Sequence, residues 1–156
     1  MIMEKYMNIA IQEAKKAIKY GDVPVGAVIV KDDVVIAKSY NKKEKHHNAL
    51  QHAEVLAINK ACKRLKSYRL SGCTMYVTFE PCLMCVGAIL SARIDKVVFG
   101  AYDHRFGACS MLVDNNFNHK TQYIGGVMEQ ECSSMLTDFF SNLRQKKSQN
   151  KIKNNK

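Results

Sequence analysis

Two short motifs place the strongest constraint on how this chain can fold. The first is His52-Ala53-Glu54, and the second, further along the chain, is Pro81-Cys82-Leu83-Met84-Cys85. Zinc in proteins takes nitrogen and sulfur donors in tetrahedral geometry, and a site that performs chemistry uses three protein ligands and leaves the fourth position to water. His52, Cys82 and Cys85 supply three such donors, and Glu54 remains as a carboxylate that does not bind the metal. The two motifs are therefore expected to meet around one catalytic zinc ion.

The spacing within each motif indicates where helices begin. Cysteines three residues apart lie on one face of a helical turn, and Pro81 is well placed to start that helix. The positive end of the helix dipole there favours the thiolate form of both cysteines. Residues two apart, such as His52 and Glu54, can face one ion only from the N-terminal end of their helix. We therefore expect His52 in a first helical turn, where Glu54 can exchange protons with water at the metal.

The same donors are also compatible with a zinc site that only stabilises the fold. Such a site needs a fourth protein ligand, for which His46, His47 or another cysteine is available. Structural sites usually draw their ligands in two close pairs, and here the first pair would be His52 with one of the two neighbouring histidines. Buried, reduced thiols are expected at the remaining cysteines, which are Cys62, Cys73, Cys109 and Cys132.

Length and composition favour one globular domain. The chain has 156 residues, of which 47% are hydrophobic, enough for a substantial core. No run approaches the roughly 18 consecutive apolar residues that a membrane span needs, and the first residues lack the layout of a signal peptide. We expect a cytoplasmic protein that does not associate with membranes.

The charge is strongly positive, and it is concentrated near the end of the chain. The formal net charge is +10, which points to a polyanionic partner such as nucleic acid. Six of the 24 basic residues lie between Arg144 and Lys156, where there is no acidic residue. We expect residues 1–144 to form the folded domain and residues 145–156 to be a basic, disordered tail. Two interpretations stay open for this tail, a solvated and frayed end or a phosphate-binding arm.

Hydrophobic periodicity predicts alternating strands and helices after an initial helix and hairpin. The order indicates a mixed sheet with helices on both faces. Residues 102–120 show no clear period and are expected to form a loop with one helical turn. The expected helices cover residues 7–18, 52–65, 82–91 and 129–147, and the expected strands cover 23–30, 34–40, 74–79, 96–101 and 123–128.

Beyond the zinc motif, which is a known signature of nucleobase deaminases, the chain closely resembles the bacterial tRNA-specific adenosine deaminases of the cytidine deaminase superfamily. The resemblance runs from the first helix to about Arg144. It implies a cytidine-deaminase-like α/β/α sandwich with a five-stranded sheet, a homodimer, one zinc ion per subunit, and conversion of adenosine to inosine at the tRNA wobble position. The informative stretches are Val23-Pro24-Val25-Gly26-Ala27-Val28, Asn41, Tyr68-Arg69-Leu70, Thr78-Phe79-Glu80-Pro81-Cys82, Arg93-Ile94, Val97-Val98-Phe99-Gly100-Ala101 and Asp138-Phe139-Phe140.

Carried over by position, the resemblance also implies substrate contacts. Asn41 would bind the flipped base, Asp103 would contact the RNA backbone near it, and Phe140 and Arg144 would help hold the anticodon loop. We also expect the backbone amides of Ala53 and Cys82 to align the base. Simpler roles remain open, since Asn41 could close a turn, Asp103 could cap a helical turn and Phe140 could belong to the core.

The chain departs from the family pattern around the expected pocket rim and RNA-contacting loop. Gln51 precedes the first motif where the family usually has alanine, Tyr102 replaces a frequent arginine, and His104-Arg105-Phe106 is unusual. These differences affect the expected choice of RNA more than the type of reaction. Two alternative functions are a free-base or nucleoside deaminase acting on guanine or cytosine, and a noncatalytic, zinc-stabilised RNA-binding subunit. The presence of Glu54 argues against the second.

Overall fold

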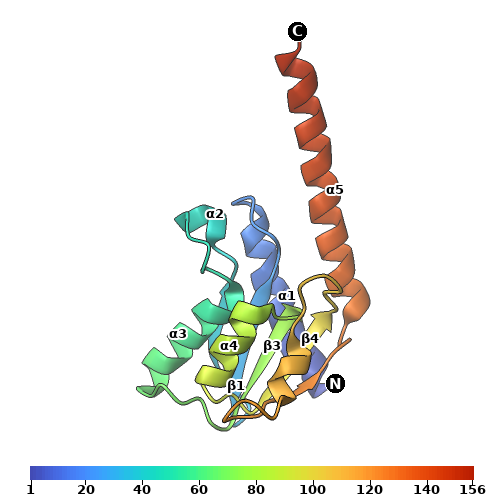
Figure 1. Ribbon diagram of the computed structural model, residues 1–156. Helices are drawn as coiled ribbons and strands as arrows, with labels where there is room; N and C mark the ends of the chain where they lie inside the picture. The colour runs from blue at the N-terminus through green and yellow to red at the C-terminus, as the bar shows by residue number, and fades with distance from the viewer.

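The computed structural model describes residues 1–156 and has three layers, with a five-stranded sheet between helices (Figure 1). The strands are β1 (Gly26–Lys31), β2 (Val34–Tyr40), β3 (Cys73–Phe79), β4 (Lys96–Ala101) and β5 (Gln122–Ile124). Their order is β2-β1-β3-β4-β5, in which β1 is antiparallel to both neighbours, whereas β3, β4 and β5 are parallel. The predicted α/β/α sandwich with a mixed sheet is confirmed.

Five α-helices and one 3-10 turn complete the fold. They are α1 (Ile2–Ile18), α2 (Lys43–His46), α3 (Ala53–Leu65), α4 (Leu83–Ser91), η1 (Cys109–Val113) and α5 (Glu129–Asn154). None of the helices combines the length and the apolar character that crossing a lipid bilayer requires.

Side chains that alternate along the strands divide the core between the two faces of the sheet. Ile29 and Phe99 belong to a cluster of 22 buried residues on the side of α3 and α4. Val28 and Val98 belong to a cluster of 11 buried residues on the side of α1 and α5. Because both faces are covered, the central strands β1, β3 and β4 are mostly buried and apolar rather than half polar.

The structure differs from the predicted elements at several ends. Strand β1 begins at Gly26 rather than Val23, because Pro24 has no backbone N–H to contribute to the sheet. The polar stretch after β2 contains the short helix α2, and β5 has only three residues. Helix α5 runs through Asn154, so the segment expected to be disordered is helical. Residues 145–154 contain no glycine or proline, and their lysines and glutamines are good helix formers.

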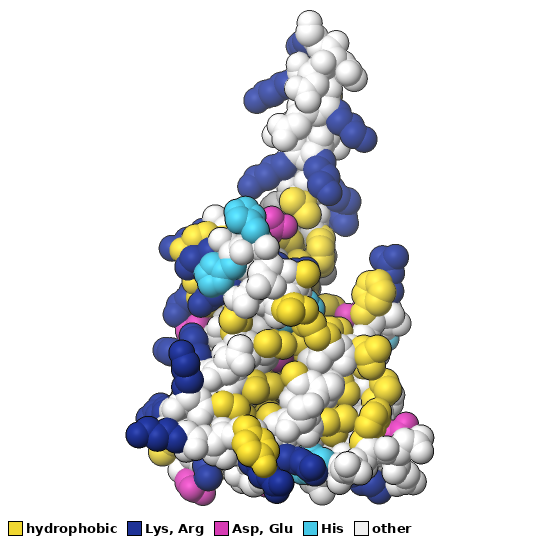
Figure 2. All heavy atoms as spheres, turned by 60° about the vertical axis from the view of Figure 1, so that its left-hand side comes forward, with side chains coloured by type: hydrophobic (Ala, Val, Ile, Leu, Met, Phe, Trp, Pro, Cys, Tyr) yellow, Lys and Arg dark blue, Asp and Glu magenta, His cyan; other side chains and the backbone are white.

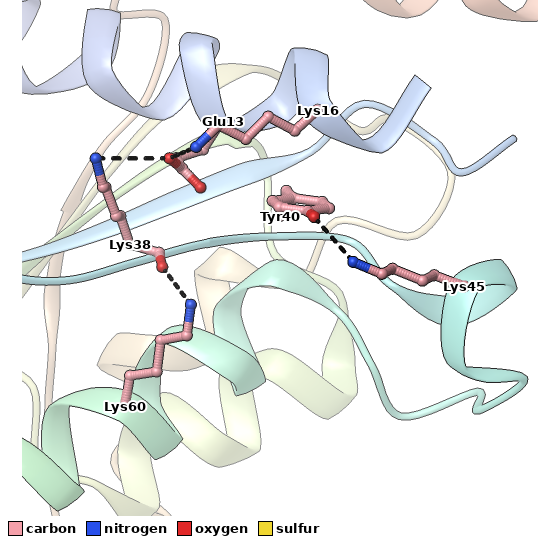
Figure 3. Close-up of polar contacts among 6 residues, drawn as sticks. All are labelled: Glu13, Lys16, Lys38, Tyr40, Lys45 and Lys60. Carbon is pink, nitrogen blue, oxygen red and sulfur yellow. Dashed lines mark hydrogen bonds and ion pairs between the residues drawn. The ribbon is translucent and has the colours of Figure 1, made fainter. Parts of the chain in front are cut away.

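Polar contacts link the surrounding helices to the edge strand β2 (Figure 3). The buried Glu13 carboxylate of α1 lies 3.8 Å from the Lys38 ammonium group. Lys60 of α3 donates a hydrogen bond to the Lys38 carbonyl oxygen at 2.9 Å, and Lys45 of α2 donates one to the Tyr40 hydroxyl at 3.4 Å. Exposed contacts of this kind add little stability, and α3 is held against the sheet mainly by buried residues such as Ala57 and Ala61.

Candidate active site

The two sequence motifs meet where helices α3 and α4 begin. His52 is the residue before the first turn of α3, and Cys82 is the corresponding residue of α4. Both have extended backbones, and neither side chain caps its own helix. Each side chain is therefore free to turn toward the other helix start, where the positive ends of two helix dipoles converge. Glu54 and Cys85 follow within the first turns.

The donor atoms of the first motif and the cysteines lie close together. The Nδ1 atom of His52 is 3.7 Å from the Cys82 sulfur and 3.4 Å from the Cys85 sulfur. Zinc–nitrogen and zinc–sulfur bonds of normal length at a tetrahedral angle require a nitrogen–sulfur separation of roughly 3.6 Å. Both cysteines are free thiols. The arrangement therefore fits a zinc ion bound by one imidazole and two thiolates.

No fourth side chain joins these three donors. The group of residues able to hold a metal consists of His52, Cys82 and Cys85, whose donor atoms lie within 4.8 Å of one another. His46, which was considered as a fourth ligand, is exposed and instead contacts the Gln51 amide oxygen at 3.0 Å. A donor set of three is characteristic of catalytic rather than structural zinc sites.

Hydrogen bonds among the three donors shift the pKa values of the two thiols in opposite directions. Contacts with Cys85 and then His52 lower the pKa of the Cys82 thiol to about 3. The contact with Cys82, followed by burial, raises the pKa of the Cys85 thiol. Hydrogen bonding to Cys82 also raises the pKa of His52, although burial opposes it. The lowered pKa of Cys82 favours its thiolate, which is the form that binds metal.

Glu54 lies beside this donor set and is almost completely buried, with 4% of its surface exposed. Burial raises the pKa of its carboxyl group, and a hydrogen bond with Cys85 partly opposes this effect. A buried carboxyl group with a raised pKa holds a proton more readily than an exposed one, which suits general acid–base chemistry.

Glu54, His52 and Cys82 line a pocket of about 570 Å³. This volume is typical of sites for small molecules or single nucleotides. Its other walls come from the ends of several elements and combine apolar with polar side chains: Val23, Val25, Asn41, Lys43, Phe79, Glu80, Leu83, Met84, Asp103, Phe106 and Phe140. The predicted residues Asn41, Asp103 and Phe140 are therefore brought to the same cavity as the metal-binding group.

Asn41 connects the pocket to the start of α3. Its Oδ1 atom accepts a hydrogen bond from the backbone N–H of Ala53 at 2.8 Å, and both residues are buried. The Ala53 amide, expected to contact a base, is therefore already engaged within the protein. No hydrogen bond to the protein involves the Nδ2 group of Asn41, which leaves this donor available on the pocket wall.

The loop after β4 is held by a carboxylate whose role the sequence did not reveal. Glu80 accepts hydrogen bonds from the backbone N–H groups of Asp103 at 3.2 Å and Cys109 at 3.3 Å. Asp103 in turn accepts hydrogen bonds from the N–H groups of Arg105 and Phe106, so it caps a turn. Its expected contact with RNA stays a prediction. These bonds fix the loop that carries Asp103 and Phe106 into the pocket wall.

Phe140, near the middle of α5, completes the pocket. Phe140 lines it with 39% of its surface exposed and packs edge-on against the buried Phe139, with ring centres 5.3 Å apart. Arg144, one turn further along α5, lines a neighbouring hollow together with Tyr102 and Phe140. Arg144 thus lies outside the pocket that contains Glu54.

Comparison with known proteins agrees with this geometry. Residues 1–144 match the family model of the MafB19-like deaminases. The chain is 48% identical to a tRNA-specific adenosine deaminase of Bacillus subtilis over 149 residues, which cover 92% of each chain.

Two solved structures are also similar. One, from work on A-to-I editing by tRNA:A34 deaminases at the wobble position, matches with a TM-score of 0.81 and 37% identity, covering 85% of this chain and 99% of its own. The other, a guanine deaminase from Bacillus subtilis, has a TM-score of 0.60 and 42% identity over 64% of each chain. The site geometry and these similarities lead to one assignment: the chain belongs to the family of tRNA-specific adenosine deaminases.

Proposed function

We propose that this protein converts adenosine to inosine at the wobble position of a tRNA anticodon by hydrolytic deamination. One observation carries the proposal: the buried carboxyl group of Glu54 lines the same pocket as His52 and Cys82, two of the three residues whose donor atoms lie close enough to hold a metal. The similarity to the Bacillus subtilis tRNA-specific adenosine deaminase over 92% of the chain supports the choice of substrate. The homodimer and the cytoplasmic location implied by the family remain predictions.

Zinc is the metal that we propose for the site, held by Nδ1 of His52 and the sulfur atoms of Cys82 and Cys85. When bound, zinc supplies Lewis acidity, which lowers the pKa of water toward neutrality and stabilises developing negative charge. Two thiolates and a neutral imidazole balance the charge of the ion, so the site has a net charge near zero. A neutral site suits a pocket with largely apolar walls.

Glu54 moves the protons of the reaction. Its carboxylate takes a proton from the attacking water and passes it to the purine ring nitrogen beside the amine-bearing carbon. A second proton from the water reaches the amine, which leaves as ammonia while the oxygen stays on the ring carbon. Adenosine and water thereby become inosine and ammonia. The buried position of Glu54 excludes bulk water that would otherwise compete for these protons.

The pocket walls hold the base during this exchange. The Nδ2 group of Asn41 donates a hydrogen bond to an acceptor nitrogen of the purine, and the ring of Phe140 forms an apolar wall. A base inside a duplex cannot reach a recessed site, so the substrate is an unpaired and extruded nucleotide. An anticodon loop presents such a nucleotide at low unstacking cost.

A free-base deaminase is the second candidate, because the guanine deaminase of Bacillus subtilis is also similar. That likeness covers 64% of this chain, whereas the match to the tRNA:A34 deaminase covers 85%. Incubation with tRNA carrying adenosine at the wobble position, and separately with free guanine and cytosine, distinguishes the two. We expect inosine in the tRNA by mass spectrometry and no ammonia from the free bases. Ammonia from guanine or cytosine without inosine in tRNA would favour the second candidate.

A further inference from the structure

Helix α5 extends well beyond the body of the molecule (Figure 1). Leu143 is the last residue of the helix with a partly buried side chain, and every residue from Arg144 to Lys156 is exposed. At 1.5 Å per residue, the helical part from residue 144 to residue 154 is ~16 Å long. We call this segment, residues 144–156, the α5 arm. Its base lies beside the pocket, because Phe140 of the preceding turn forms part of the pocket wall.

The α5 arm carries only positive charge. Figure 2 shows lysine and arginine side chains along its length, and no acidic residue occurs in it. No ion pair within the protein engages any of its six basic side chains. Lys147 and Lys151 are four residues apart on one helix face, so they repel each other. A polyanion that passes along this face would relieve the repulsion.

The positions of the basic residues define two opposite faces. Phe140, Arg144, Lys147 and Lys151 follow one another at spacings of four, three and four residues, which places them in one stripe along the helix. This stripe begins at the pocket and continues to the outer part of the arm. Lys146 and Lys153 lie on the other face, where Lys146 borders a groove against α1.

We propose that the stripe formed by Arg144, Lys147 and Lys151 binds the phosphate backbone of the paired stem next to the target nucleotide. This inference rests on the proposed function, because it concerns the same RNA whose base enters the pocket. The stripe runs outward from the pocket wall. The stem of an RNA whose target nucleotide is bound in the pocket can therefore lie along the stripe.

The composition of the arm favours a duplex over other occupants. The arm has no aromatic residue on which unpaired bases could stack. Surfaces that bind single strands depend on such residues. Ile152 is the only large apolar side chain of the arm, so there is no apolar face to enter a membrane or to pack against a partner helix. A second copy of the arm would be repelled by its charge. The phosphates of a paired stem are the occupant that suits a row of basic side chains without aromatic or apolar neighbours.

The test compares two double variants that remove the same charge. K147A/K151A changes the pocket-side stripe, and K146A/K153A is the matched control on the other face. Binding is measured with a hairpin that has the full anticodon stem and with one whose stem is shortened, across a series of salt concentrations. We expect K147A/K151A to bind the full hairpin roughly tenfold more weakly, with a salt slope reduced by about 1 to 2, while the control changes little.

The expected pattern also includes the stem dependence. The parent protein should prefer the full stem, and K147A/K151A, which retains Arg144, should show a much smaller preference. Equal effects of the two double variants, or an unchanged preference of K147A/K151A for the full stem, would overturn the assignment. Inosine formation by the parent protein is measured on the same RNA, so failure of the proposed function would appear as absence of inosine, independently of the arm.

Discussion

Replacing Asn41 with alanine should weaken the start of α3 by an amount that the structure allows us to estimate. The substitution removes a buried hydrogen bond of 2.8 Å and leaves the N–H of Ala53 without a partner. An unsatisfied buried donor costs ~1–3 kcal/mol. In a chain of this size each kcal/mol lowers the melting temperature by about 2–4 °C, so a mid-range loss of ~2 kcal/mol lowers it by about 4–8 °C. Circular dichroism during heating measures this shift.

Asn41→Asp is the matched variant that separates stability from catalysis. Aspartate keeps an oxygen that accepts the Ala53 N–H, and a carboxylate at a helix N-terminus is favourable. It lacks the Nδ2 donor that we assign to the base. We therefore expect Asn41→Asp to recover most of the melting temperature that Asn41→Ala loses. Its kcat/KM with tRNA should stay roughly tenfold below that of the parent, as for one lost hydrogen bond. An unchanged melting temperature in Asn41→Ala would refute the structural role. Parental kcat/KM in Asn41→Asp would refute the contact with the base.

Two further substitutions test the loop and the metal site. Glu80→Gln replaces the carboxylate that accepts hydrogen bonds from the N–H groups of Asp103 and Cys109. We expect a several-fold higher KM for tRNA, with nearly unchanged kcat and zinc content. A parental KM in steady-state kinetics would contradict this role. Cys85→Ser removes one sulfur donor, and elemental analysis should find much less than one zinc per chain, whereas Cys132→Ser, at a buried thiol elsewhere, should keep its zinc. Full zinc content in Cys85→Ser would exclude that ligand.

The elements around the site were predictable because their signals are local. His52 and Cys82 precede helix starts for reasons that appear in a few neighbouring residues, such as Pro81 before the second helix. The central strands β1, β3 and β4 were found because both faces of the sheet are covered there, which makes these strands mostly apolar runs. The fold class followed from the order of these elements.

Other features depend on contacts that leave no local pattern. Glu80 binds backbone groups 23 and 29 residues further along the chain, and nothing in its neighbourhood indicates those partners. Helix α2 has only four residues, too few for a periodic signal, and its position depends on contacts such as that of Lys45 with Tyr40. The extension of α5 was missed because a run of lysines is typical of solvated tails as well as of exposed helices.

The role of Glu54 is tested most directly by Glu54→Gln, which keeps the shape of the side chain but cannot carry the proton. Zinc content, tRNA affinity and inosine formation are measured on one preparation of this variant. We expect one zinc per chain, unchanged tRNA affinity and inosine formation slower by roughly 10²–10⁴-fold, the usual contribution of a general acid–base group. Inosine formation at nearly the parental rate, with zinc and tRNA still bound, would show that Glu54 is not the proton carrier.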